Sequence, residues 1–377
     1  MDKWKIPLYR IESSKNDYQG ISKVIKRKSD WAIGPEIEKF EEKLSKYLKT
    51  DYCVSFNSGT SAQHAALLAL DIKPNFEIIV PSFTFISTPN SVLMINAKPV
   101  FSDIETKSLG LDPNLLQKKI SKKTKAIMPI HYSGGACEIE EILKISNKNK
   151  IHLIEDAAES LGCKIGTKKV GTYGLIGIFS FAANKIITSG EGGALVTNSK
   201  KVFEKLKLIR SHGRLDKEKY FQSNLKPNYI SLGFNWRMSS ITAALALSQL
   251  NRIESIISKR RKNAQYFSQR LNEINEISLP FEDGFRHVYQ MYSIRVKNKL
   301  IRNSLMKYLS KNGIMTKIYF DSVHKTPYYN KLGYSKISLP NTDLISNQIL
   351  SLPIFANMKN YEMKKIVDVI EDFFRTK

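Results

Sequence analysis

The sequence predicts an α/β fold: a large domain with a mostly parallel mixed sheet covered by helices, followed by a smaller C-terminal α+β domain. Apolar strand patterns alternate with helical patterns over residues 50–250, which is typical of a parallel sheet buried on both faces. The composition changes near Ser258, where a basic stretch leads into a helix. We therefore expect a large domain over residues 1–257, including an N-terminal segment, and a small domain over residues 258–377.

Composition places the chain among ordinary globular proteins, with 42% hydrophobic and 25% charged residues in 377. Cys53, Cys137 and Cys163 show no CxxC spacing, which argues against a disulfide framework or a metal site and fits a reducing cytoplasm. No apolar run approaches the roughly 18–20 residues of a membrane span. The start, MDKWKIPLYR, has no apolar signal core. A cytoplasmic location without a membrane partner is therefore expected.

The formal net charge of +24 has two interpretations. It creates a field that attracts anions such as nucleic acid or a phosphorylated substrate, or it reflects lysines spread over a solvated surface. The lysines are scattered along the chain and form no dense basic arm. We therefore expect no nucleic-acid partner.

Taken in order, the chain first predicts a helix after Gly34-Pro35, from the apolar spacing of Ile37, Phe40, Leu44, Tyr47 and Leu48. A strand over residues 52–56 follows, and then a Ser-Gly-Thr turn opens an alanine-rich helix. Free backbone N–H groups and hydroxyls at such a helix start can hold a phosphate. Simple N-capping by Ser58 or Thr60 is the alternative interpretation.

Further strands are expected over residues 77–80, 99–104, 126–135 and 151–160. After the first of them, Phe83 and Phe85 alternate as core residues do, although one of them could instead lie against a flat cofactor. The last strand ends in Glu155, Asp156 and Glu159. Carboxylates at the carboxyl end of a parallel strand lie where ligands bind, and one could pair with a cationic ring nitrogen or cap a helix.

The stretch from Ile176 to Thr197 predicts an apolar strand, a polar turn and a second apolar strand. Ser180 lies in the first strand and Lys185 at its end. A lysine inside apolar sequence either forms a Schiff base with a carbonyl cofactor or extends its amine from a strand end into water. The turn contains Gly190, Gly192 and Gly193, each of which can adopt backbone angles closed to other residues.

A basic helix over residues 199–210 follows, and apolar spacing from Met238 to Ile257 predicts an amphipathic helix capped by Ser239 or Ser240. The C-terminal part contains a strand-like pattern over residues 289–296 and a helical pattern over 301–312.

These features occur in an order that resembles the DegT/StrS-type family of pyridoxal-phosphate-dependent sugar aminotransferases, which have the aspartate aminotransferase fold (fold type I). The block FSFxxxK…GEGG after EDAAES is the most specific part of the resemblance, which covers essentially the whole chain. It implies that Lys185 carries the cofactor as a Schiff base, Asp156 faces the pyridine nitrogen, Glu159 contacts the ring hydroxyl and Phe85 stacks on the ring.

The remaining implied contacts come from both subunits of a dimer. The implied phosphate ligands are Gly59, Thr60 and Ser180. Asn235 resembles an asparagine that reaches the phosphate of the neighbouring subunit, which implies a homodimer with shared active sites. The segments that resemble the lining of a sugar-nucleotide pocket contain Arg237, Tyr319 and His324.

The resemblance also implies a substrate class. The segment NKIITSGEGG is similar to the corresponding segment of members of the perosamine synthase type. Those members aminate a nucleotide-linked 4-keto-6-deoxyhexose with glutamate as donor. Amination at position 3 and a non-enzymatic cofactor-binding regulator are the alternatives, although the chain has no spare segment for a DNA-binding domain. Members that dehydrate sugars replace the lysine by histidine, so Lys185 favours transamination. The run TKIYFDSVH departs from the family pattern at Lys317, Ile318 and Asp321, and this leaves the sugar open.

Overall fold

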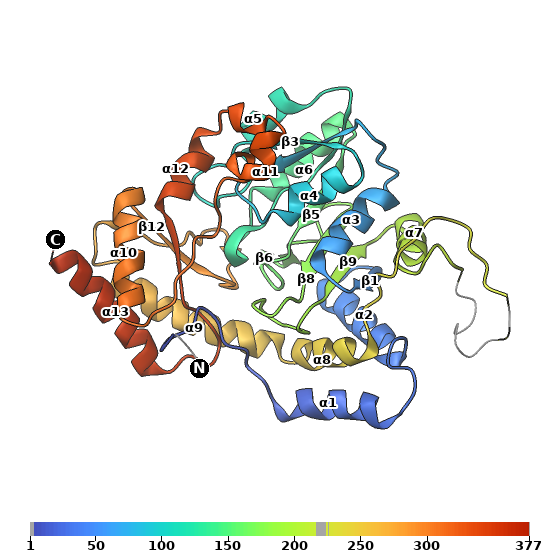
Figure 1. The fold of residues 1–377 in the computed structure, drawn as a ribbon, viewed down its shortest axis with the longest axis horizontal. Coiled ribbons are helices and arrows are strands. Elements are labelled where there is room, and N and C mark those ends of the chain that lie inside the picture. Colours follow the sequence, from blue (N-terminus) through green and yellow to red (C-terminus); the bar gives the residue numbers. More distant parts are fainter. Residues whose placement is uncertain (1–3, 216–223, 225, 377) are drawn as a thin grey trace.

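The computed structural model describes residues 4–215, 224 and 226–376, and it confirms the α/β fold (Figure 1). A seven-stranded sheet forms the centre of the large domain. Strand β9 is antiparallel to both of its neighbours, and the other pairings in this sheet are parallel. In spatial order the strands are β1 (Tyr52–Phe56), β9 (Gly193–Thr197), β8 (Ile176–Ser180), β5 (His152–Asp156), β4 (Thr124–Ile127), β2 (Glu77–Pro81) and β3 (Lys98–Ser102).

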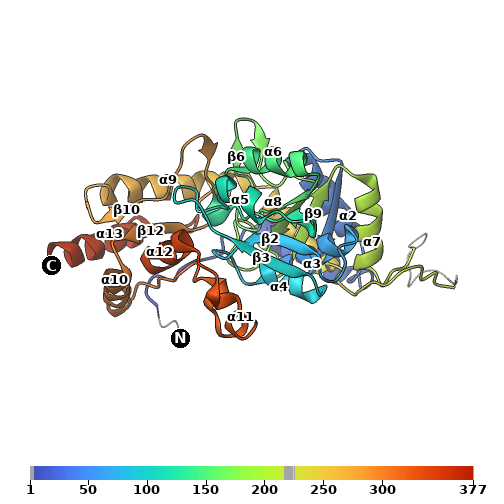
Figure 2. The same ribbon diagram turned by 90° about the horizontal axis from the view of Figure 1, so that it is seen from above.

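Helices cover both faces of this sheet (Figure 2). On one face lie α3 (Gly59–Ala69), α4 (Ser87–Met94) and α7 (Lys200–Arg210). On the other lie α2 (Pro35–Leu48), α5 (Pro113–Lys119), α6 (Ile139–Asn149) and α8 (Ser240–Leu250), with α1 (Lys15–Lys26) packed on α8.

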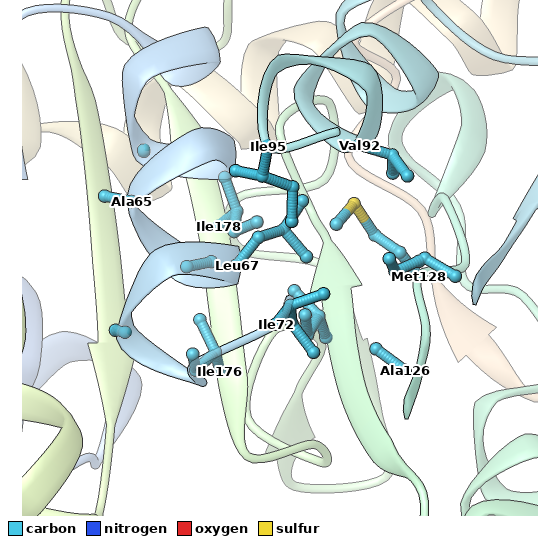
Figure 3. Close-up of a cluster of buried hydrophobic side chains, with 14 of the residues drawn as sticks. Ala65, Leu67, Ile72, Val92, Ile95, Ala126, Met128, Ile176 and Ile178 are labelled. Carbon is cyan, nitrogen blue, oxygen red and sulfur yellow. The ribbon is translucent and has the colours of Figure 1, made fainter. Parts of the chain in front are cut away.

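Strand alternation divides the apolar side chains between the two faces. Ile176 and Ile178 of β8 point toward α3 and contribute to the cluster that contains Leu67 (Figure 3). Phe179 points to the opposite face and packs with α2 and α8. Each strand is therefore buried on both sides, and the ends of the strands are the places where polar groups can collect.

The C-terminal part has its own core around a second, antiparallel sheet of order β10-β12-β13. Its elements are α9 (Ile253–Leu271), β10 (Ile277–Ser278), β12 (Tyr292–Val296), α10 (Lys299–Lys311), α11 (Pro327–Lys331), α12 (Pro340–Gln348), β13 (Ile349–Leu352) and α13 (Asn360–Arg375). A third small sheet joins β6 (Lys164–Ile165), β7 (Lys168–Lys169) and β11 (Phe285–Arg286).

The helix expected from Met238 to Ile257 is two helices, α8 and α9, of which Ser239 caps the first by accepting from the Thr242 N–H. The apolar spacing continues across the break because both helices bury their apolar sides in the same cluster. Helix α9 then runs through the predicted domain boundary at 257/258. Its later residues join the C-terminal core. The two domain ranges stay a prediction.

The strand expected over residues 126–135 is also shorter than predicted, because β4 ends at Ile127. Pro129 has no N–H to donate to a sheet. Beyond it Ile130 makes one bridge to Asp156, and the chain turns in a short 3-10 helix over Tyr132–Gly134. This turn carries Ser133 toward the end of β5, where its N–H meets Glu159.

Among the described residues, no helix is both long enough and apolar enough to cross a membrane.

Candidate active site

The start of α3 lies directly against the end of β8. A Cβ placed on Gly59 would be 3.1 Å from Cβ of Ser180 and 3.3 Å from its Oγ. Ser58 caps the helix, since its Oγ accepts from the Ser61 N–H at 3.0 Å. The N–H groups of Gly59 and Thr60 donate to no group in the described part of the chain. Together with the helix dipole, these two N–H groups and the Ser180 hydroxyl form a site suited to a phosphate.

The turn glycines differ in why a glycine is needed at each position. Gly190 has a positive φ of +83°, whereas Gly192 and Gly193 are not in the left-handed region. A Cβ on Gly193 would lie 2.3 Å from the Ser58 carbonyl oxygen and 2.7 Å from the Gly59 nitrogen. Gly193 therefore lets β9 approach the backbone at the start of α3. Of the three turn glycines, Gly190 alone uses the left-handed backbone angles that glycine can adopt.

Asp156 lies at the end of β5 and is only 2% exposed. Its Oδ2 accepts from Nε2 of Gln63 at 2.7 Å and from Oγ1 of Thr88 at 2.8 Å. Its Oδ1 accepts from the Ala158 N–H at 3.2 Å. Burial raises the pKa of Asp156, and the donors Thr88 and Ala158 and the charge of Lys185 oppose this rise.

Lys185 and Glu159 are paired beside Asp156. Nζ of Lys185 is 3.5 Å from Oε1 of Glu159, and the lysine side chain is 14% exposed. Oε2 of Glu159 accepts from the Ser133 N–H at 3.0 Å. Burial raises the pKa of Glu159, while Lys185 lowers it. The sequence-predicted lysine and both carboxylates are thus brought together at one edge of the sheet.

Phe83 and Phe85 have opposite surroundings. Phe83 is fully buried, whereas Phe85 is 55% exposed, and its ring centroid lies 6.2 Å from that of Phe320. Phe83 is therefore a core residue, and Phe85 is the one available to cover a flat ligand.

A neighbouring pair supports this edge of the sheet from the opposite side of β5. His131 Nε2 donates to Oε2 of Glu155 at 3.0 Å, and its Nδ1 lies 3.3 Å from the Cys137 nitrogen. Glu155 also accepts from three backbone N–H groups, those of Gly171, Tyr173 and Gly174. This pair is structural, as a histidine at a strand end usually is.

The four other predicted contacts are more dispersed. Asn235 is exposed and its backbone bridges to Ser211. Arg237 lines a cavity of about 690 Å³ between α2 and α7. Lys185 does not line this cavity. Tyr319 accepts a hydrogen bond from Tyr132 through its backbone carbonyl, and its pKa is raised by burial and by nearby Glu159.

His324 is fully buried, and its Nδ1 lies 2.7 Å from Oγ of Ser82. Its Nε2 has no hydrogen-bond partner among the described residues. The roles of Asn235, Arg237, Tyr319 and His324 in substrate or cofactor binding stay predictions.

Sequence reasoning missed the groups that hold the carboxylates. Gln63, Thr88 and Ser133 all contact Asp156 or Glu159. Gln63 could have been found, since it is a polar residue on the buried side of an otherwise alanine- and leucine-rich helix. Thr88 lies in the first turn of α4 and Ser133 in a short 3-10 helix, and neither leaves such a signal.

The residues at this edge fit pyridoxal phosphate, the cofactor that the resemblance implies. Two N–H groups without partners in the described chain lie at the start of α3, and a buried carboxylate lies at the end of β5. Lys185 pairs with Glu159 beside that carboxylate, and Phe85 offers an exposed aromatic ring. An anion, a cationic ring nitrogen, a carbonyl carbon and a flat ring are the chemical groups that such residues bind.

Comparisons with known proteins agree with this arrangement. The model of the DegT/DnrJ/EryC1/StrS aminotransferase family matches residues 12–371. GDP-perosamine synthase of Vibrio cholerae is 32% identical over 98% of this chain and 99% of its own. A pleiotropic regulatory protein of Geobacillus stearothermophilus is 31% identical over 97% and 96%. The structure of Helicobacter pylori PseC, an aminotransferase involved in the biosynthesis of pseudoaminic acid, aligns with a TM-score of 0.92, 28% identity and coverage of 99% and 100%.

The close approach at Gly193 yields a test of the phosphate site. We expect Gly193→Ala to weaken pyridoxal phosphate binding about tenfold or more, because the new Cβ displaces the Ser58–Gly59 backbone. Gly20→Ala, in the middle of α1, is the matched control. The nearest atom to a Cβ there would be the Ala244 carbonyl oxygen at 3.5 Å, an ordinary van der Waals distance. This variant should bind normally and gain about 0.5–1 kcal/mol of stability. Unchanged cofactor affinity in Gly193→Ala would show that the phosphate lies elsewhere.

Proposed function

The chain belongs to the DegT/DnrJ/EryC1/StrS aminotransferase family, and we propose that it is a pyridoxal-phosphate-dependent aminotransferase of nucleotide-linked keto sugars. Its substrate in this proposal is a 4-keto-6-deoxyhexose, and glutamate is the amino donor. The observation that carries the proposal is the meeting of Lys185, Glu159 and the buried Asp156 at one edge of the sheet, next to the start of α3.

Four groups hold the phosphate and one face of the ring in this proposal. Gly59 and Thr60 bind the phosphate through backbone N–H groups, and Ser180 binds it through its hydroxyl. Phe85 covers one face of the ring. When bound, pyridoxal phosphate supplies a carbonyl that carries the amino group and a ring that withdraws electrons.

The charged residues have separate tasks. Asp156 keeps a proton on the ring nitrogen, because an ionised carboxylate favours a cationic partner. Glu159 accepts a hydrogen bond from the ring hydroxyl. Nζ of Lys185 would hold the cofactor covalently. As a free amine, it would act as general base and acid and move a proton between the substrate carbon and the cofactor carbon.

The sugar and the nucleotide are the finer part of the proposal. It draws on the 32% identical GDP-perosamine synthase and on PseC, both of which are named for amino-sugar pathways. The net charge of +24 suits a diphosphate-bearing substrate. Arg237, Tyr319 and His324 are the residues proposed to contact it. The pleiotropic regulatory relative supports a regulator as the second candidate.

The role of Lys185 is tested by trapping. We expect the purified protein to be yellow with pyridoxal phosphate, and borohydride to fix the cofactor on Lys185, detected by peptide mass spectrometry. Lys185→Ala should be colourless and inactive. Lys169→Ala is the matched control, because Lys169 is also partly buried but donates to the Tyr47 carbonyl away from this edge. Full turnover by Lys185→Ala would contradict the assignment.

Shared active sites are tested by complementation. Asn235 is proposed to reach the partner's cofactor, so Asn235→Ala and Lys185→Ala should each be inactive as homodimers. In a mixed dimer one site has both defects and the other has none. Co-expression should therefore restore about a quarter of the parent activity, measured as the loss of the visible cofactor band with glutamate. The proposal of shared active sites would be ruled out if a verified mixed dimer recovered no activity. It would also be ruled out if light scattering showed a monomer with full activity.

The substrate class is tested with a panel of nucleotide keto sugars made in situ by dehydratases. With glutamate added, mass spectrometry should detect the change from keto to amine on a 4-keto-6-deoxy sugar. Amination of a 3-keto sugar instead would favour the alternative position. Rapid exchange between ordinary amino acids and keto acids, with no sugar reaction, would make the chain an amino-acid aminotransferase.

A further inference from the structure

The two oxygens of the Asp156 carboxylate differ in the hydrogen bonds that they accept. Its Oδ2 accepts two short hydrogen bonds, at 2.7 Å from Nε2 of Gln63 and 2.8 Å from Oγ1 of Thr88. In the described part of the chain, Oδ1 accepts one longer bond, at 3.2 Å from the Ala158 N–H. One oxygen is therefore held by side chains, and the other retains accepting capacity.

The hydrogens around Oδ2 all point toward it. The hydroxyl of Thr88 has a single hydrogen, which it donates to Asp156, so it must accept from Thr84 Oγ1 at 2.9 Å. The Gln63 amide presents its NH₂ group, because a carbonyl oxygen facing a carboxylate would be repelled. Its own Oε1 is buried without a partner among the described residues. An amide that leaves its oxygen unpaired in this way is oriented by the carboxylate and not by its other surroundings.

Helix α3 connects these donors to the phosphate site. Gly59 and Thr60 open the helix, and Gln63 follows one turn later on the buried side. A helix rises 1.5 Å per residue, so the donor to Asp156 lies about 5–6 Å along the axis from the phosphate end. One rigid element thus sets the separation between the anion site and the carboxylate.

Burial disfavours the charge on Asp156 and raises its pKa. The charged or titratable groups around it are Lys185, Glu159 and His131. Lys185 and His131 favour the ionised carboxylate, and Glu159 opposes it. Neutral donors at Oδ2 favour the ionised form without adding another charge to the site.

We propose that Gln63 and Thr88 are positioning residues that hold Asp156 ionised by its Oδ2, so that Oδ1 is directed at the ring nitrogen of the cofactor. This inference rests on the proposed function, since it requires pyridoxal phosphate at this site. Neither residue touches the reacting atoms. Both act through Asp156, by keeping the ring nitrogen protonated.

The test compares Gln63→Leu, Thr88→Val and Thr88→Ser with the parent. Gln63→Leu and Thr88→Val should each raise the dissociation constant of pyridoxal phosphate about tenfold. They should also move the pH midpoint of the visible absorbance of the bound cofactor upward, by about one unit. A ring that loses its positive charge no longer lowers the pKa of the nitrogen that links it to Lys185. Thr88→Ser keeps the hydroxyl and should resemble the parent.

Thr342→Val is the matched control, because Thr342 is a buried threonine that donates to buried Asp103 at 2.7 Å. It should lower the melting temperature of the cofactor-free protein about as much as Thr88→Val, but leave the affinity and the pH midpoint unchanged.

Parent-like affinity and pH midpoint in both Gln63→Leu and Thr88→Val would overturn the inference, as would an equal change in the control. If the unaltered protein bound no pyridoxal phosphate, the proposed function itself would fail. The two failures are thus distinguishable.

Discussion

The buried negative charge of Asp156 is the constraint on which the rest of the site depends. A carboxylate that is 2% exposed is unstable by several kcal/mol unless donors and opposite charges surround it. Helix α3 supplies Gln63, the first turn of α4 supplies Thr88, and the turn after β8 supplies Lys185. The elements that meet at this edge of the sheet are therefore those that compensate the charge, and they leave Oδ1 with capacity to accept a further hydrogen bond.

Much of this arrangement was predictable from the sequence, because its strongest signals are local. Alternating strands and helices predicted the sheet, and the two apolar stretches around Ser180 and Ala194 predicted the antiparallel pair β8–β9. Lys185 was expected at the end of the first strand, but β8 ends at Ser180 and Lys185 lies in the turn that follows. The partners of Asp156 were not predictable: Gln63 is noticeable as a buried polar residue in an alanine- and leucine-rich helix, but it lies 93 positions from Asp156, and Thr88 lies 68 positions away. The need for glycine at Gly193 was also hidden, because it arises from the approach of Ser58, a residue from the other end of the domain.

The proposed cofactor contacts and the proposed substrate contacts lie in different parts of the chain. Lys185, Glu159 and Asp156 meet at the ends of β5 and β8 within one chain. Asn235 and Arg237 lie on the segment after α7, where Arg237 lines a cavity that Lys185 does not line. Residues proposed to serve a neighbouring subunit need not meet the cofactor residues of their own chain. The sequence also departs from the family pattern before His324, in the part proposed to recognise the sugar.

The most direct test of the account is a crystal structure of the protein grown with pyridoxal phosphate. The account predicts continuous density between Lys185 Nζ and the cofactor, with the phosphate at the N–H groups of Gly59 and Thr60. It also predicts the ring nitrogen within about 3 Å of Oδ1 of Asp156. A cofactor bound with its phosphate away from α3, or with its ring nitrogen turned from Asp156, would contradict it.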